Sequence, residues 1–313
     1  MSIKSSGNSL AFSEIEAEFG QNGGRSLGGY RLTQNVGSLS NLPLDTGIPT
    51  SGQIKFSDFY GKRLNVVVDC HSGGREDRKS AKGDKWNNNA VTVIGGFRSK
   101  KESGSKIIIN VNKKFCSDKS NQINCALKTG SWDSTATVQV DVGSNGEVLG
   151  AGGDGGKGAD GINNNGESGL PGTSALGIEH NGITVNIASG GVLRCGFGGG
   201  GGGGGAGCPA GNGGQGGSTG GGFGSGSGGP GGAGTETTGG GGGGGGNNGG
   251  QAYGGPGGSG GQAQGNAGGG QSRNTAGGGG GGNGAAIRRT SGFSVTINNS
   301  GSITGDQNAT GVG

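Results

Sequence analysis

The sequence predicts a mainly β chain with much irregular structure, in three parts that are built differently. Two observations carry this prediction. Glycine supplies 90 of the 313 residues, and a pattern of alternating apolar residues followed by a polar turn recurs three times. Only 18 glycines lie in residues 1–145, against 72 in residues 146–313. We therefore expect a small N-terminal segment over residues 1–62, a short-stranded β domain over 63–145 and a glycine-rich domain over 146–313.

The N-terminal segment contains a short repeat. Residues 10–14 read Leu-Ala-Phe-Ser-Glu, residues 54–58 read Ile-Lys-Phe-Ser-Asp, and residues 25–30 form a weaker third copy. Ser followed by an acid predicts an N-cap with negative charge in the first helical turn. The two helices would end at Gly20 and Gly61, and both are too short to be stable alone. We therefore expect the segment to dock on another protein, with six candidate contact residues: Phe12, Glu14, Phe19, Phe56, Asp58 and Phe59.

The β domain is predicted from five short runs rich in β-branched residues, separated by turn signals. This spacing favours a small sandwich or a barrel-like module. The region from Lys62 to Lys128 is basic, with 15 Lys and Arg against 6 Asp and Glu. Such a surface either faces an anionic partner, such as lipopolysaccharide or an acidic protein, or is simply a solvated face.

The recurring pattern occupies residues 138–150, 183–195 and 293–305. Each copy has three alternating apolar residues, a polar turn, a glycine, and one more apolar residue two places on. Alternation of this kind predicts a half-buried strand, and the turn predicts a second short strand after it. The first copy overlaps the last run of the β domain, so the two parts should be continuous. A unit that cannot bury its apolar face alone indicates stacked β rungs.

Unbroken glycine blocks occupy residues 198–205, 239–246 and 277–282. Such runs form either a flexible linker or a packed array of polyglycine II helices, in which the absent Cβ lets neighbouring chains touch. The flanking rungs favour the array, since a linker does not need them. We therefore predict a polyglycine II helix sandwich braced by β-strand rungs. Replacing the three glycines Gly201, Gly242 and Gly279 with valine would then prevent folding, because each Cβ would intrude on a neighbour, whereas a linker would tolerate all three.

The sequence contains no recognisable catalytic site, and we expect no enzyme activity, cofactor or bound metal. The only histidines, His71 and His180, lie in no motif, and His71 next to Cys70 would point to the opposite face of a strand. Residues 155–163 match one copy of a calcium-binding β-roll nonapeptide, but such sites need tandem copies. The net charge of +4 does not indicate a nucleic-acid binder.

Cysteine usage and hydropathy indicate where the chain is made. Five cysteines without a paired framework fit assembly in a reducing cytoplasm. The N-terminus does not read as a signal peptide, and no apolar run approaches the length of a membrane span. Recognition is expected at the non-glycine tips between the glycine blocks, because loops on a rigid scaffold carry binding residues. The candidates are Phe223, Glu236, Asn247, Tyr253 and Arg273.

The rung at residues 183–195, followed by the glycine block at 198–205, resembles the glycine-rich domain of tail-fibre adhesins of T-even-type tailed phages. The resemblance covers about residues 138–313. It implies polyglycine II helices packed as a sandwich, with the loops between glycine motifs binding outer-membrane receptors. The Phe-Ser-acid copies are similar to segments of phage tail and baseplate proteins, but they differ from the start of the T-even adhesins. The resemblance does not cover the basic β domain.

The hypothesis is therefore a virion receptor-binding protein of the tail, attached to other tail proteins and recognising a bacterial outer-membrane protein or surface glycan. It would be made in the host cytoplasm and carried on the virion. An alternative is a structural tail or baseplate component whose glycine domain binds no receptor. A non-viral glycine-rich surface or ice-binding protein is a third class, and the irregular lengths and varied tips count against it.

Overall fold

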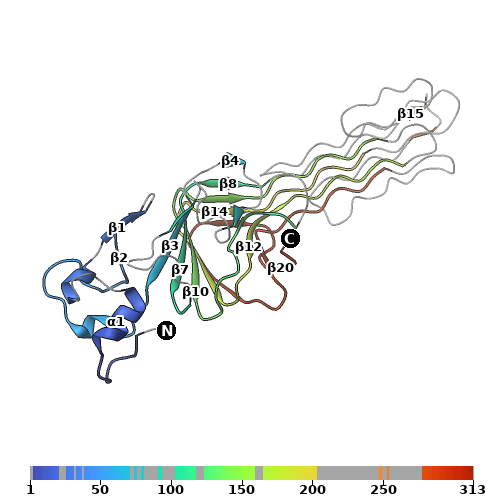
Figure 1. Ribbon diagram of the computed structural model, residues 1–313. Coiled ribbons are helices and arrows are strands. Elements are labelled where there is room, and N and C mark those ends of the chain that lie inside the picture. Colours follow the sequence, from blue (N-terminus) through green and yellow to red (C-terminus); the bar gives the residue numbers. More distant parts are fainter. Residues whose placement is uncertain are drawn as a thin grey trace.

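The computed structural model describes three parts in sequence order: an N-terminal helical module, a three-sided parallel β-helix, and a glycine-rich extension that projects from it (Figure 1). Figure 1 places α1 (Phe12–Phe19) near one end of the molecule and β15 (Asn247–Asn248) at the other. The described residues are 3–20, 26–31, 33–36, 39–70, 74–75, 79–80, 91–93, 103–117, 123–158, 165–202, 247–248, 252–253 and 277–312.

The N-terminal module is built from short helices around an aromatic cluster. Its elements are α1 (Phe12–Phe19), η1 (Leu27–Tyr30), the antiparallel pair β1 (Thr33–Val36) and β2 (Leu39–Pro43), and η2 (Phe56–Phe59). The rings of Phe19, Tyr30 and Phe59 are fully buried, with centroids 5.7–6.2 Å apart. The three copies of the predicted repeat thus each form a helix and share one core. Burial of aromatic side chains stabilises helices that are too short to form alone.

The predicted helix ends are confirmed, but the predicted N-caps are wrong. The chain turns at Gly20 and Gly61, both with positive φ, as expected after these helices. The N-caps are Ala11 and Lys55, so each Ser lies inside the first turn. The following acid provides the cap, since Glu14 and Asp58 each accept a hydrogen bond from the N-cap backbone N–H, at 2.8 and 2.7 Å. This contact, with Lys4 3.0 Å away, lowers the pKa of Glu14.

From residue 65 onward, fifteen of the strands form three parallel sheets, and each coil of the chain contributes to all three sheets in turn. Five coils stack, and each contributes one strand to each sheet. The coils are β3 (Asn65–Cys70), β4 (Gly74–Arg75) and β5 (Lys79–Ser80); β7 (Lys106–Val111), β8 (Lys114–Cys116) and β9 (Cys125–Lys128); β10 (Thr137–Val142), β11 (Glu147–Leu149) and β12 (Ser174–Ile178); β13 (Ile183–Ile187), β14 (Val192–Arg194) and β17 (Ile287–Arg289); β18 (Val295–Asn299), β19 (Ser302–Thr304) and β20 (Ala309–Thr310).

The predicted sandwich or barrel-like module is therefore wrong. The physical reason is that strands of successive coils pair in parallel and in register. Equivalent apolar residues of successive coils stack in register, as in Ile109, Val140 and Val185, all fully buried. The apolar residues of one coil are buried only because the neighbouring coils stack on them in this inward row. The first coil is covered by β6 (Val91–Val93), which pairs antiparallel with β3. It is also covered by the helical module, where the Glu18 carboxylate accepts a hydrogen bond from Leu64 N–H at 2.8 Å.

The predicted continuity of the β domain with the repeat is confirmed, and the alignment of the copies is confirmed for two of them. Val140 pairs with Val185, and Val148 with Leu193, as aligned. In the third copy Val295, not Phe293, lies beside Ile183. The turn between β18 and β19 has two residues, against four between β13 and β14. The shorter turn shifts the first strand of that copy by two positions, while the second strand keeps the expected register.

The extension is inserted into two successive coils of the β-helix. It lies between β11 and β12 in the third coil and between β14 and β17 in the fourth. Apart from a short strand pair at residues 247–248 and 252–253, its described parts are chiefly four extended segments, at residues 150–157, 167–173, 196–202 and 278–284, which run beside one another (Figure 1). Backbone N–H groups donate across the segments at every third residue. Gly150, Gly153 and Gly156 donate to the carbonyls of Arg194, Phe197 and Gly200, each at 2.8 Å. Gly196, Gly199 and Gly202 donate to Thr173, Leu170 and Glu167, at 2.8–2.9 Å.

Glycine is required where a Cβ would meet the backbone of a neighbouring segment, because the segments approach one another at backbone distance. A Cβ on Gly199 or Gly201 would overlap the carbonyl oxygen of Asp154 or Gly278, in keeping with the expectation for Gly201. The expectation for Gly279 is wrong, because the nearest atom to a Cβ there is Ser168 Oγ at 3.7 Å. A Cβ on Gly279 would point away from the neighbouring segments. In this segment the glycines that admit no Cβ are Gly278, Gly281 and Gly284, which are three residues apart. Gly242 lies outside the described residues.

Candidate functional site

Two of the five predicted receptor-binding residues come together in the structure. Strand β15 (Asn247–Asn248) pairs antiparallel with β16 (Ala252–Tyr253), and Asn247 lies opposite Tyr253 in this pair. Figure 1 places β15 at the end of the extension that is farthest from α1. The other three candidates, Phe223, Glu236 and Arg273, lie outside the described residues.

The backbone of the extension explains how this end of the molecule is held away from the β-helix. Segments 196–202 and 167–173 are hydrogen-bonded to each other. Each of them is also hydrogen-bonded to both segment 150–157 and segment 278–284. Four segments joined in this way resist bending more than one extended chain does, because bending must break several hydrogen bonds together. The extension therefore has the geometry of an arm that presents its far end.

The six predicted docking residues divide between core and surface. Phe19 and Phe59 are fully buried in the aromatic cluster, and the Glu14 and Asp58 carboxylates cap their own helices. Phe56 is 41% exposed, and its ring lies 6.4 Å from that of the partly buried Phe12. Of the six, Phe56 offers the largest apolar surface to a partner.

The described residues contain no arrangement typical of catalysis. No group of three or more His, Cys, Asp and Glu that could hold a metal ion is found among them. Burial, with a smaller contribution from Asp69, raises the pKa of Cys70 to about 12, and burial raises the pKa of Cys125 to about 12. Both thiols therefore stay protonated and unreactive at neutral pH. The His180 Nε2 atom lies 3.3 Å from the Ala136 carbonyl oxygen in a buried structural contact.

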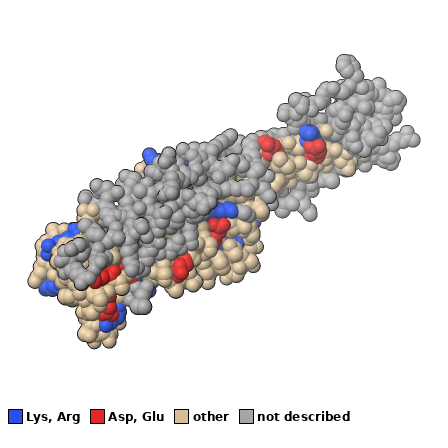
Figure 2. Space-filling view, in the orientation of Figure 1, with Lys and Arg blue, Asp and Glu red and all other residues tan. Residues whose placement is uncertain are grey.

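The basic region of the sequence does not form a single-sign patch on its described part. Lys114 and Lys128 lie 3.7 Å from the carboxylates of Glu147 and Glu179, and Arg63 Nη1 donates to Thr137 Oγ1 at 3.0 Å. On the face in Figure 2, positive and negative groups of the described residues are interspersed among neutral ones. These contacts favour a solvated, structural surface over an anion-binding one for the described residues.

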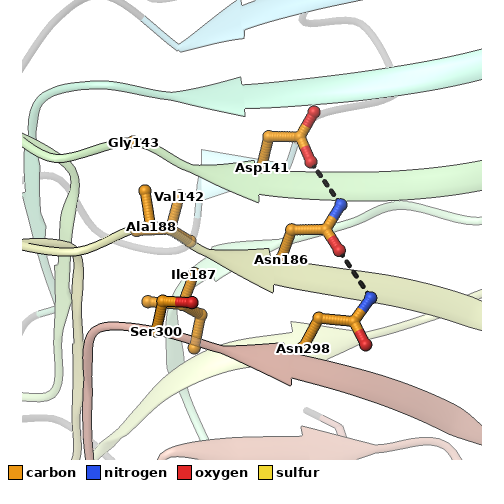
Figure 3. Close-up of a pocket in the computed structure, with 8 residues that line it drawn as sticks. All are labelled: Asp141, Val142, Gly143, Asn186, Ile187, Ala188, Asn298 and Ser300. Carbon is orange, nitrogen blue, oxygen red and sulfur yellow. Dashed lines mark hydrogen bonds between the residues drawn. The ribbon is translucent and has the colours of Figure 1, made fainter.

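A pocket of about 340 Å³ lies on the outer face of the sheet formed by β10, β13 and β18. One side is a column of polar side chains, Asp141, Asn186 and Asn298, which occupy the same register position on three neighbouring strands (Figure 3). Asn186 Nδ2 donates to Asp141 Oδ1 at 2.7 Å, and Asn298 Nδ2 donates to Asn186 Oδ1 at 2.8 Å. The remaining lining residues are Val142, Gly143, Ile187, Ala188 and Ser300.

Sequence reasoning missed this pocket although part of its signal was present. Asp141 and Asn186 occupy equivalent positions in the aligned first and second copies, and two polar residues at one outward position predict a lateral contact. The sequence alignment did not place Asn298 at this position, because the third copy has a shorter turn. The alignment error of two residues therefore concealed the third member of the column.

A stacked β-helix that carries a backbone-bonded arm is a scaffold for presenting a surface, and its described residues offer no catalytic centre. The sequence matches the family described as phage tail fibre adhesin Gp38 over residues 78–308. The chain belongs to this family, and it is accordingly a tail component of a phage virion with an adhesin role. The comparisons with curated proteins and with solved structures gave no match.

The family assignment agrees with the resemblance inferred from the sequence and extends it into the basic β domain, because the match begins at residue 78. That region forms the first coils of the β-helix, so the family match spans both the coils and the extension. None of the helices among the described residues has the length and apolar character needed to cross a membrane.

Proposed function

We propose that the chain recognises a receptor on the bacterial surface, an outer-membrane protein or a glycan, through the far end of the glycine-rich extension. The observation that carries this proposal is the position of the paired strands β15 and β16 at the end of the arm, with Asn247 opposite Tyr253. Tyr is a frequent anchor of binding surfaces, since it combines a large apolar area with a polar tip. Phe223, Glu236 and Arg273 belong to the same proposed recognition set.

The proposal includes polyglycine II helices as the structure of the arm. Its support is the three-residue period of the hydrogen bonds between segments and of the glycines that admit no Cβ. Three residues per turn, with backbone groups directed outward to neighbouring chains, are the properties of this helix. Such a lattice needs no apolar core, which fits a domain of this composition.

Binding of the fluorescently labelled full chain to bacterial strains infected by the parent phage tests the proposal. The full chain is used because β10 pairs with β7, so a fragment without the first coils would lose its packing. Asn247→Ala and Tyr253→Ala should each weaken strain-selective binding about tenfold or more, which corresponds to about 1.4 kcal/mol. Asn308→Ala, an exposed asparagine on the last coil, is the matched control.

The alternative is a structural tail or baseplate component that binds no receptor. It predicts that the folded chain binds none of the strains the phage infects, and that it does not compete with virions for adsorption. Absence of both effects in a protein with intact thermal unfolding would overturn the receptor-binding proposal.

The N-terminal module is proposed to attach the chain to other tail proteins, with Phe56 as the apolar contact. Among the side chains that the structure describes in this module, Phe56 is the large hydrophobic one that is exposed. Phe56→Ser should reduce incorporation into virions while leaving thermal unfolding almost unchanged. Thr46→Ser, an exposed change in the same module, is the control. Normal incorporation of Phe56→Ser would place the attachment surface elsewhere. In this proposal the chain is made in the host cytoplasm before it joins the tail.

A further inference from the structure

The hydrogen bonds along Asp141, Asn186 and Asn298 run in one fixed direction. This direction determines which donors and acceptors the pocket offers to a ligand. An ionised carboxylate accepts hydrogen bonds and donates none, so Asn186 must present its N–H to Asp141. Its carbonyl oxygen then faces Asn298, which must also donate. Gln139 Nε2 donates to both carboxylate oxygens of Asp141 at 2.8 Å and holds the carboxylate in place. The direction of the whole column therefore follows from one acidic residue.

The column leaves polar groups that can serve a ligand. Each carboxamide has two N–H groups, and the column uses one of them in Asn186 and one in Asn298. The pocket thus contains amide donors, the Asn298 carbonyl oxygen at the end of the column, and the Ser300 hydroxyl (Figure 3). Groups that donate and groups that accept lie side by side, which suits a hydroxyl, since a hydroxyl does both.

The opposite side of the pocket is apolar. Val142 and Ile187 are buried beneath it, and the Ala188 methyl group is exposed beside it. No Lys, Arg or His lines the pocket, and the Asp141 carboxylate repels anions, so phosphate and carboxylate ligands are disfavoured. A ligand that fits has hydroxyl groups along one edge, C–H groups on one face and no negative charge.

We propose that this pocket is a binding site for one neutral sugar unit of a saccharide, separate from the far end of the extension. The hydroxyl edge of the sugar would bond to Asn186, Asn298 and Ser300, and its C–H face would lie on Ala188. The sites are on different parts of the molecule, because the pocket is on the β-helix and β15 is at the end of the arm (Figure 1). An adhesin with two such sites would hold a surface glycan along its side while its tip engages a receptor.

Saturation-transfer NMR on the full chain tests the proposal with methyl glycosides of glucose, galactose, mannose and N-acetylglucosamine, at concentrations up to about 100 mM because one sugar in a shallow pocket binds weakly. At least one glycoside should show transfer to its ring protons. Ala188→Leu, which fills the pocket from an exposed position, should abolish the transfer, and Asn298→Ala should reduce it severalfold. Thr296→Val, on the same strand and outside the pocket lining, is the matched control and should retain it.

Two results would overturn the proposal. The first is the absence of transfer from all four glycosides to the folded wild-type chain. The second is transfer that persists in Ala188→Leu, which would place the sugar elsewhere. Tyr253→Ala should leave the signal unchanged, so loss of cell binding and loss of sugar binding are separable. Circular dichroism and thermal unfolding of each variant confirm that the β-helix is intact.

Discussion

The β-helix and the glycine-rich extension are both made of extended chain, and they are stabilised by different interactions. In the β-helix, rows of Val, Ile and Leu point inward and are almost fully buried. In the described segments of the extension, the interior is backbone, and carbonyl oxygens occupy the space where side chains would stand. The same chain therefore needs side-chain volume in one part and its absence in the other. Opposite substitutions should consequently destabilise the two parts.

The largest effect is expected from adding one methyl group inside the extension. Gly199→Ala would drive its Cβ into the carbonyl oxygen of Asp154, so at least two segments must separate. We expect a loss of about 3 kcal/mol or more in the free energy of unfolding of the extension, or failure to fold. Gly279→Ala is the control, because its Cβ has no neighbour closer than 3.7 Å. Limited proteolysis and thermal unfolding measure both. Equal tolerance of the two variants would refute the packed array.

The reverse substitution, removal of side-chain volume, should destabilise the β-helix. Ile109→Ala empties a fully buried position in the second coil and should cost about 3 kcal/mol of unfolding free energy. Ile297→Ala is in the same inward row but on the last coil, where the side chain is only partly buried. It should cost about 1 kcal/mol. Guanidinium unfolding monitored by circular dichroism gives both values, and a similar cost at the two positions would contradict the stacked-core account.

The buried thiols should make the β-helix sensitive to alkaline pH. The folded-state pKa values of Cys70 and Cys125 are raised to about 12 from 9.0, so above pH 9 the unfolded chain loses these protons first. Unfolding free energy should therefore fall as pH rises from about 9 towards 12, by about 1.4 kcal/mol per pH unit for each thiol. Urea unfolding of the wild type and of Cys70→Ala/Cys125→Ala between pH 8 and pH 10 measures the difference. If the unfolding free energy of both proteins fell equally with pH, the thiols would not be the cause of the decrease.

The smallest effect is expected on the outer face of the β-helix, where packing is not the main interaction. Asn186→Ala removes both hydrogen bonds of the polar column and should cost about 1–2 kcal/mol. Asn298→Ala removes one bond at an exposed edge and should cost less, about 0.5 kcal/mol. Thermal unfolding ranks the two variants. A larger loss for Asn298→Ala would show that the column is not the stabilising feature.

Local patterns predicted the elements well where neighbouring residues determine them. The helix ends at Gly20 and Gly61 and the strand-turn-strand units at Val140 and Val185 follow from sequence, because glycine conformation and alternation act over a few residues. The N-caps were predicted two residues too late, at Ser13 and Ser57, since the acid rather than the serine satisfies the backbone N–H. The docking interpretation of Phe19 and Phe59 could not separate a core aromatic from a contact aromatic, because both give the same apolar pattern.

The arrangement of the candidate sites depends on contacts between distant residues. Asn247 and Tyr253 were predicted singly, and the structure adds their pairing. Asp141, Asn186 and Asn298 are separated by 45 and 112 residues in sequence and form one column only because the coils stack in register. No local pattern predicts that spacing, since the glycine-rich extension interrupts the coils at unequal intervals.

The sequence by itself determined the composition break, the β-branched rungs and the need for chain segments without side chains, because these follow from alternation and from the missing Cβ of glycine. The tertiary structure alone decided that the rungs close into three parallel sheets with one inward row. It also decided which glycines admit no methyl group and which outward residues meet at the pocket. Parallel strands that pair belong to successive coils and are joined by long connections, so their pairing depends on contacts between segments that are distant in the sequence.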